Sequence, residues 1–256
     1  MTDSEPSGAT FGEVSLTPAG GHVAILSLNA PERRNAITPS LACQIVAAVE
    51  AAEGNDECRA IVLAGSGPAF CAGAELSELD KASASDSEAV LRSIYDAFLR
   101  VRSSTLPTVA AVAGPAVGAG LNLAMACDMR IAGRGARFDS RFLRLGLHPG
   151  GGASWMLNAA VGMPTTSAML LFGEVVDGIA AERLGLAWKC VDDDEVLPCA
   201  VALAGQAARA PKELSARIKA TLNDAARAPT HAQALEVEFE RQVWSFRQPW
   251  FTQRRA

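Results

Sequence analysis

A glycine pattern that occurs twice constrains the fold of this 256-residue chain more than any other feature. Residues 67–76 (GPAFCAGAEL) and residues 114–123 (GPAVGAGLNL) both follow the spacing GPAxxAGxxL. An apolar run precedes each copy, at residues 60–64 and 107–112. Each copy therefore predicts a buried strand that leads into a glycine-rich bend. The second copy continues as a helical pattern that ends near Cys127.

A bend followed by a helix leaves the N–H groups of the first helical turn without intrahelical partners. Those donors and the positive end of the helix dipole favour an oxygen that carries or develops negative charge. Two such bends that converge would place two N–H donors on one oxyanion, such as a thioester enolate or a tetrahedral intermediate. Two packing turns of a repetitive fold are the alternative, and the pattern alone is compatible with both.

Three motifs together resemble the crotonase superfamily, the enoyl-CoA hydratase/isomerase group. They are FCAGAEL in the first bend, AGPAVGAGLNLAMACD around the second, and PERRNAI near the N-terminus. The resemblance extends from about Gly12 to the end of the chain. It implies an α/β fold, namely a spiral of ββα repeats with a C-terminal α-helical oligomerisation region. It also implies an acyl-CoA substrate, so coenzyme A enters as part of the substrate and no cofactor is bound permanently.

The resemblance implies site residues as well. The backbone N–H groups of Ala74 and Ala119 would form the oxyanion hole. The PERRNAI loop would lie along the phosphates and adenine of coenzyme A, although a solvated surface turn is the alternative for its two arginines. The residues implied in substrate and CoA binding are Arg33, Arg34, Ala36, Ala72, Gly73, Gly118 and Gly120.

Both hydratase glutamates are substituted in this sequence. Their positions hold Asn122 and Phe142, and the position of an aspartate found in dienoyl-CoA isomerases holds Gly150. An asparagine amide orients water but cannot act as a base near neutral pH, and a phenylalanine does neither. We therefore expect enolate-type chemistry, such as isomerisation or hydrolysis, rather than efficient hydration. A non-catalytic acyl-CoA-binding protein on the same scaffold is the alternative.

Few acid/base candidates remain in the central segment. Between residues 107 and 156 the only acids are Asp128 and Asp139, and we expect Asp128 to be structural. Asp139 either reaches the acyl group or pairs with a neighbouring arginine, Arg137 or Arg141. His148 is the other candidate, because histidine carries protons near neutral pH.

Composition excludes several other classes of protein. The net charge of −5 gives no reason to expect nucleic-acid binding, so the phosphates of CoA need local basic residues. The six cysteines lack a C-x-x-C pair, and the three histidines are far apart, which favours reduced thiols in the cytoplasm and neither a metal site nor a disulfide. Leu123 stands where a dinucleotide fingerprint needs Gly or Ala, and there is no G-x-S-x-G elbow.

The chain divides into three regions by pattern. Residues 1–10 are polar and predict a disordered tail, residues 11–195 predict the spiral core that binds acyl-CoA, and residues 196–256 predict a helical region. The resemblance implies that this last region packs subunits into a homotrimer or a dimer of trimers. Its aromatic residues near the end of the chain would form an interface or pack on their own core. No apolar run is long enough to span a membrane.

Overall fold

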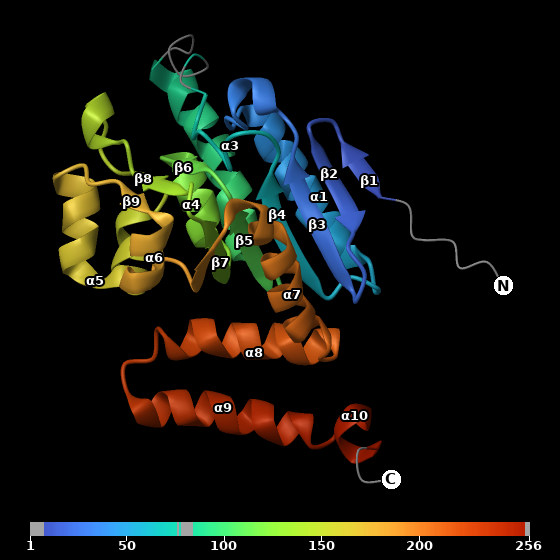
Figure 1. Cartoon of the computed structure of the whole chain (residues 1–256). Helices are drawn as coiled ribbons and strands as arrows, with labels where there is room; N and C mark the ends of the chain where they lie inside the picture. Colours follow the sequence, from blue (N-terminus) through green and yellow to red (C-terminus); the bar gives the residue numbers. More distant parts are fainter. Residues whose placement is uncertain (1–7, 76, 78–83, 254–256) are drawn as a thin grey trace.

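The structure is a computed structural model that describes residues 8–75, 77 and 84–253 (Figure 1). Most of the expected tail, residues 1–7, lies outside the described residues. A seven-stranded sheet has the order β1-β2-β3-β4-β5-β7-β10, antiparallel from β1 to β3 and parallel from there on. Its strands are β1 (Ala9–Phe11), β2 (Val14–Pro18), β3 (Val23–Leu28), β4 (Ala60–Gly65), β5 (Thr108–Val112), β7 (Met129–Gly133) and β10 (Lys189–Val191).

Helices cover both faces of this sheet, as the apolar composition of β4 and β5 requires. On one face, α1 (Pro39–Gly54), α3 (Ala84–Arg102) and α4 (Ala119–Ala126) share the larger core with Ile61 and Leu63. On the other face, α7 (Val196–Ala208) packs on β3, β4, β5 and β7, where Val62 joins the smaller core. The alternation of residues 61–63 follows the two-residue period of a strand. Thr38 caps α1, because its side-chain oxygen accepts the N–H of Leu41 at 3.0 Å.

A second, smaller sheet extends the spiral beside the first. Its strands have the order β6-β8-β9, with β6 (Pro115–Val117) parallel to β8 (Arg137–Asp139) and β9 (Val176–Asp177) antiparallel to β8. Around it lie α5 (Ala153–Leu171), which is broken at Gly162, and α6 (Gly178–Leu184). The short 3-10 helices are η1 (Pro31–Arg33), η2 (Leu143–Leu145) and η3 (Asp193–Glu195).

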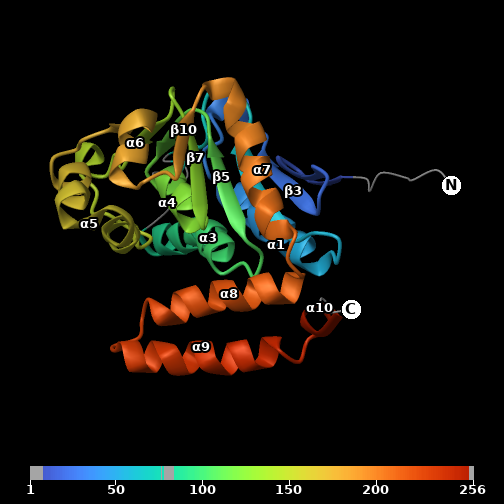
Figure 2. The same cartoon turned by 60° about the horizontal axis from the view of Figure 1, so that its bottom comes forward.

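The C-terminal helices leave the sheet after α7. They are α8 (Lys212–Ala225), α9 (His231–Ser245) and α10 (Pro249–Thr252). In both views α9 lies along α8, away from the sheets (Figures 1 and 2). Lys219 on α8 is the anchor to the core: its buried ammonium donates to Leu106 O at 2.9 Å and lies 2.8 Å from Asp128 Oδ2. Asp128 also accepts the N–H and hydroxyl of Thr108, which is the structural setting expected for it.

Two elements of the structure lie at the boundaries predicted from the sequence. Ala9 and Thr10, expected in the tail, belong to β1 and pair with β2. The expected core boundary near residue 195 falls at the start of α7, whose buried face includes Val196 and Ala200. The apolar face of α7 belongs to the smaller core. The helices that lie outside the sheet layers therefore begin with α8, at Lys212. No described helix is long and apolar enough to span a membrane.

Candidate active site

The two glycine turns interlock. Cys71 and Ala116 form a parallel bridge, in which Cys71 N–H donates to Pro115 O at 3.1 Å and Val117 N–H donates to Cys71 O at 3.0 Å. This approach requires glycine at position 120, because a Cβ there would lie 2.2 Å from Cys71 O. The convergence inferred from the repeated pattern is therefore a backbone-to-backbone contact.

Each turn presents one unused N–H group. In the first turn, Ile37 N–H donates to Gly73 O at 2.7 Å and Glu75 N–H donates to Ile37 O at 3.0 Å. Successive backbone groups of an extended chain alternate in direction, so the N–H of Ala74 points away from this pairing. In the second turn, Ala119 is the first residue of α4, where the N–H has no intrahelical acceptor. Neither N–H has an acceptor among the described residues, and both residues line one cavity.

A buried asparagine in the PERRNAI loop supports the first turn. Asn35 is fully buried with a left-handed φ of 57°, and its Oδ1 accepts Ala30 N–H at 2.9 Å. Its Nδ2 donates to the carbonyls of Ser66 at 2.9 Å, Ala69 at 3.0 Å and Phe70 at 3.3 Å. The loop that the sequence associated with CoA thus also holds the strand-to-turn junction in place.

The cavity has a volume of about 540 Å³ and is mostly apolar, which suits an acyl chain. The first turn contributes Ala72, Gly73 and Ala74, and the second contributes Val117, Gly118, Ala119 and Asn122. The remaining lining residues come from α3 and the segment after β8: Ser87, Glu88, Leu91, Ile94, Tyr95, Ser140, Arg141, Phe142, Leu145, Leu147, His148 and Gly150.

Asn122 and Phe142, which hold the two glutamate positions implied by the resemblance, both line this cavity. Asn122 is 2% exposed, its Nδ2 donates to Gly150 O at 3.0 Å, and its Oδ1 is buried without a partner among the described residues. Phe142 lines the cavity and packs against the larger core. Both positions therefore hold a neutral side chain beside the predicted oxyanion hole.

Asp139 is buried at the end of β8 and bound to arginines. Its Oδ1 accepts the N–H of Arg141 at 2.9 Å, and its Oδ2 accepts Arg141 Nε at 2.8 Å and lies 3.6 Å from Arg144 Nη1. Asp139 is not one of the residues lining the cavity. The sequence left two arrangements open for this carboxylate, and the pairing with Arg141 is the one the structure has.

His148 lines the cavity at its exposed rim. Its Nδ1 lies 2.8 Å from Pro149 O. Because a carbonyl oxygen only accepts, this contact requires the proton on Nδ1 in the neutral ring and leaves Nε2 as the basic nitrogen. No described residue bonds to Nε2, so it is available to a bound molecule.

Tyr95, the only tyrosine of the chain, also lines the cavity, and sequence reasoning missed it. A Cβ on Gly150 would lie 2.3 Å from its hydroxyl, so the phenol occupies space that a larger residue at position 150 would need. Tyr95 lies on α3, and no motif in the sequence pointed to this helix. The one signal that could have identified Tyr95 is that the sequence contains a single tyrosine.

The two candidate CoA arginines differ in their partners. The guanidinium of Arg33 is half-buried and paired with the carboxylates of Glu13 and Glu32; its hydrogen bond with Glu13 raises the pKa of Arg33 and lowers that of Glu13. Arg34 is exposed and has no ion pair among the described residues. Ala36, in the same PERRNAI loop, is buried. Only the Arg34 side chain is therefore free to meet a phosphate.

The cysteines are free thiols, and Cys58, Cys71 and Cys127 are buried. Burial raises the pKa of the Cys71 thiol to about 12, so this residue of the first turn stays protonated. Its Sγ donates to Asn35 O at 3.1 Å. Within the described ranges, no three His, Cys, Asp or Glu side chains are grouped so that they could hold a metal ion.

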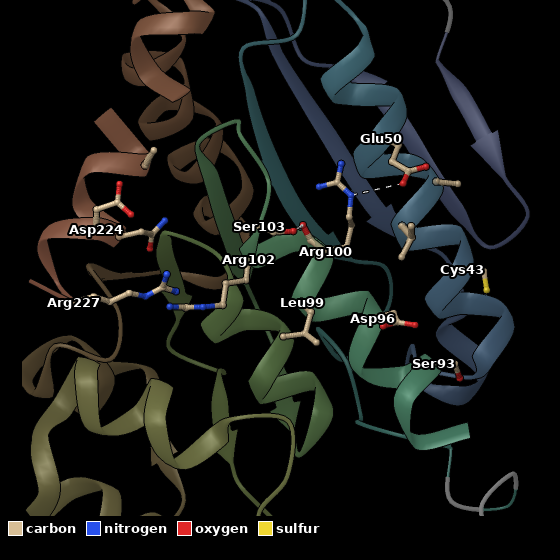
Figure 3. A pocket seen from close by; sticks show the side chains of 14 residues that line it. Cys43, Glu50, Ser93, Asp96, Leu99, Arg100, Arg102, Ser103, Asp224 and Arg227 are labelled. Carbon is tan, nitrogen blue, oxygen red and sulfur yellow. Dashed lines mark hydrogen bonds and ion pairs between the residues drawn. The ribbon is translucent and has the colours of Figure 1, made fainter. Parts of the chain in front are cut away.

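A larger hollow of about 1010 Å³ lies between α1, α3 and α8 (Figure 3). Charged side chains border it, and Figure 3 shows Arg102 and Arg227 pointing toward one another. The part of α3 that borders this hollow runs from Ser93 to Arg102, whereas residues 87–95 border the cavity at the turns. Neither glycine turn borders this hollow, so the smaller cavity is the candidate active site.

Known proteins resemble this chain over most of its length. The family model described as enoyl-CoA hydratase/isomerase matches residues 19–249. A "Probable enoyl-CoA hydratase" of Mycobacterium tuberculosis is 46% identical over 92% of this chain and 93% of that protein. Another protein with that description, from Rhodobacter capsulatus, is 39% identical, covering 85% of this chain and 84% of its own length.

A solved structure has the same fold. The crystal structure of an enoyl-CoA hydratase from Polaromonas sp. JS666 superposes with a TM-score of 0.87 at 32% identity, covering 93% of both chains. The crotonase-like α/β fold expected from the motifs is therefore confirmed. With the glycine turns in one cavity and the family model matching nearly the whole chain, the protein belongs to the enoyl-CoA hydratase/isomerase family of the crotonase superfamily.

Proposed function

We propose that this protein binds an acyl-CoA thioester and stabilises its enolate between the N–H groups of Ala74 and Ala119. One observation carries the proposal: two interlocked backbone turns direct unused N–H donors into one largely apolar cavity. Donors fixed before the reaction stabilise developing negative charge without reorganisation, which is worth about 3 kcal/mol per donor. The reaction is enolate-type chemistry, such as isomerisation or hydrolysis, rather than efficient hydration.

His148 is the proton carrier that the cavity supports best. Its Nε2 has no hydrogen-bond partner among the described residues. Asp139, by contrast, is bound to Arg141 and does not line the cavity. The exposed position of His148 lets it exchange protons with solvent between turnovers. Removing a positioned acid or base costs about 10²–10⁴-fold in rate.

Exchange of the α-protons of a saturated acyl-CoA tests enolate formation without assuming a product. Butyryl-CoA in deuterated buffer should lose its α-proton signals in the NMR spectrum when the parent protein is added. A His148→Gln variant should exchange at least about a hundredfold more slowly while binding butyryl-CoA as tightly. Undiminished exchange in that folded variant would assign proton transfer to another group.

A non-catalytic acyl-CoA-binding protein is the second candidate. The neutral Asn122 and Phe142 at the glutamate positions favour it, because they leave the cavity with few proton-transfer groups. This function predicts tight thioester binding with α-proton exchange no faster than in buffer. The same NMR experiment therefore separates the two functions.

We also propose that the chain forms a homotrimer or a dimer of trimers through α8 and α9. No residue of α9 is buried, and Leu235 and Phe239 are 50% and 59% exposed. Aromatic residues at the end of α9 and beyond it pack on one another, with Trp244 edge-on to Trp250 at 5.9 Å and Phe246 5.0 Å from Phe251. Light scattering coupled to size-exclusion chromatography measures the state directly, and a monomeric mass would contradict the proposal.

A further inference from the structure

We propose that Arg141 selects acyl groups that end in a carboxylate, so the preferred ligand is the CoA monothioester of a short dicarboxylic acid. This inference rests on the proposed function, because it names the acyl class bound in the same cavity. Arg141 borders the cavity, and the sequence had assigned it only a pairing role with Asp139. It shares this cavity with Ala74 and Ala119, where the thioester would lie.

The position of Arg141 is fixed by the second glycine turn. Gly118 N–H donates to Asp139 O at 2.9 Å, which ties the segment after β8 to the residue preceding Ala119. Asp139 then accepts the backbone N–H and Nε of Arg141, and its Oδ2 lies 2.7 Å from Arg141 Nη2. Nη1 of Arg141 donates to no described residue, so the outer edge of the guanidinium remains available. A planar fork of this kind suits a second carboxylate.

The charges around this loop leave an excess of one positive charge. Arg141 and Arg144 both lie against the single carboxylate of Asp139. Glu88 is the only acidic side chain among the described lining residues, and Arg92 neutralises it with hydrogen bonds of 3.0 and 2.6 Å. The cluster of Asp139, Arg141 and Arg144 therefore carries one net positive charge, and Arg141 is its arginine that lines the mostly apolar cavity, where an anionic acyl end would balance that charge.

The backbone of Arg141 is also unusual. Its φ of 59° lies in the left-handed region, which side chains other than Gly, Asn and Asp rarely adopt. Such strained residues persist where the surroundings hold them, and they cluster at ligand-binding sites. Here the three contacts with Asp139 hold the strained residue with its side chain at the cavity.

Two thioesters that differ only by a terminal carboxylate test the inference. Glutaryl-CoA and pentanoyl-CoA have acyl chains of equal length, and isothermal titration gives the ratio of their dissociation constants. The parent should bind glutaryl-CoA about ten- to a hundredfold more tightly, as expected for hydrogen bonds between charged groups in a partly buried site. Equal binding of the two thioesters by the parent would overturn the inference without any variant.

Matched variants locate the effect. Arg141→Gln should abolish the preference for glutaryl-CoA while pentanoyl-CoA binds within about threefold of the parent. Arg144→Gln also removes one positive charge beside Asp139, but Arg144 does not line the cavity. The preference for glutaryl-CoA should therefore persist in this variant. Arg141→Lys, a point charge without the fork, should keep part of the preference and tests the site if Arg141→Gln unfolds.

The outcomes separate this inference from the proposed function. If neither thioester binds, the proposed function fails and the inference fails with it. If both bind and Arg144→Gln abolishes the preference as fully as Arg141→Gln, the preference comes from the general field of the loop, and the assignment to Arg141 is overturned.

Discussion

The two glycine turns have the same sequence spacing, yet the molecule supports them in different ways. The first turn rests on the PERRNAI loop, through the pairing of Ile37 with Gly73 and Glu75 and the buried amide of Asn35. The second turn rests on a helix, because Ala119 begins α4. A repeated pattern therefore specifies where two donors converge, while the elements that hold each donor come from unrelated parts of the chain.

The largest expected effect concerns Asn122 and Phe142, the two neutral residues beside the predicted oxyanion hole. Hydration of crotonyl-CoA should be about 10⁴-fold slower than in an ordinary hydratase, since Asn122 and Phe142 cannot transfer protons and paired groups act as a unit. The measurement is crotonyl-CoA turnover by the parent. Hydratase-like activity in the parent would contradict the prediction.

The double variant Asn122→Glu/Phe142→Glu restores the carboxylates and should raise that turnover. Its matched control is Asn122→Gln/Phe142→Gln, which has a similar shape without the acids and should gain nothing. Thermal unfolding of both variants must accompany the kinetics, because an unpaired buried charge at either position destabilises the fold.

The next effect distinguishes the supports of the two turns. Asn35→Ala should lower the free energy of unfolding by roughly 3 to 5 kcal/mol, because each buried backbone group left unpaired costs about 1–3 kcal/mol. Asn122→Ala removes a single hydrogen bond beside the second turn and should cost less. Denaturant unfolding measures both, and equal losses would show that the two turns are supported alike.

Removing the donors themselves should have a similar effect in both turns. Ala74→Pro and Ala119→Pro each delete one N–H and should weaken binding of an acyl-CoA enolate analogue by about 3 kcal/mol. Proline is well tolerated at the first position of a helix, so Ala119→Pro should also unfold near the parent temperature. Ala74→Gly and Ala119→Gly keep the donors and are the controls. A folded proline variant with unchanged affinity would remove that residue from the oxyanion hole.

The smallest expected effect concerns the loop that supports the first turn. Arg34→Ala should weaken CoA binding by about 1 kcal/mol at low salt and by less at high salt, since exposed charges are screened beyond about 8–10 Å. Arg33→Ala should change this salt dependence less, because Glu13 and Glu32 already neutralise that guanidinium. Titrations of CoA at two salt concentrations compare the variants, and identical salt dependence would contradict the distinction.

Sequence reasoning predicted the elements whose information is local. The apolar runs of β4 and β5 were predicted from neighbouring residues. The short strands β6, β8 and β9 were missed, because they form through pairing between distant segments and leave almost no periodicity. The helical character of α7 was predicted, but its packing on the sheet was not, because that packing also depends on distant segments.

At the site, the motifs identified the two turns and the cavity they share, while partners distant in sequence decided what each side chain does. Asn35 and Ser66 are 31 residues apart, and no local pattern specifies that hydrogen bond. Arg33 and Arg34 are adjacent and equivalent by sequence, and their ion pairs distinguish them, above all the pair of Arg33 with the distant Glu13. Tyr95 enters the cavity because Gly150 lacks a Cβ, which is a contact between α3 and the loop before α5.

The Lys219 anchor has a consequence for synthesis of the chain. Lys219 and Leu106 are 113 residues apart, so the carbonyl of Leu106 and the carboxylate of Asp128 emerge from a ribosome long before the ammonium that binds them both. The spiral up to α7 can assemble as it emerges, because its neighbouring strands pair in order. The segment between α3 and β5 stays without its contacts to Lys219 until α8 has been synthesised. A nascent chain arrested before residue 219 should therefore be cut by protease near residues 103–107, and one extended past α8 should resist.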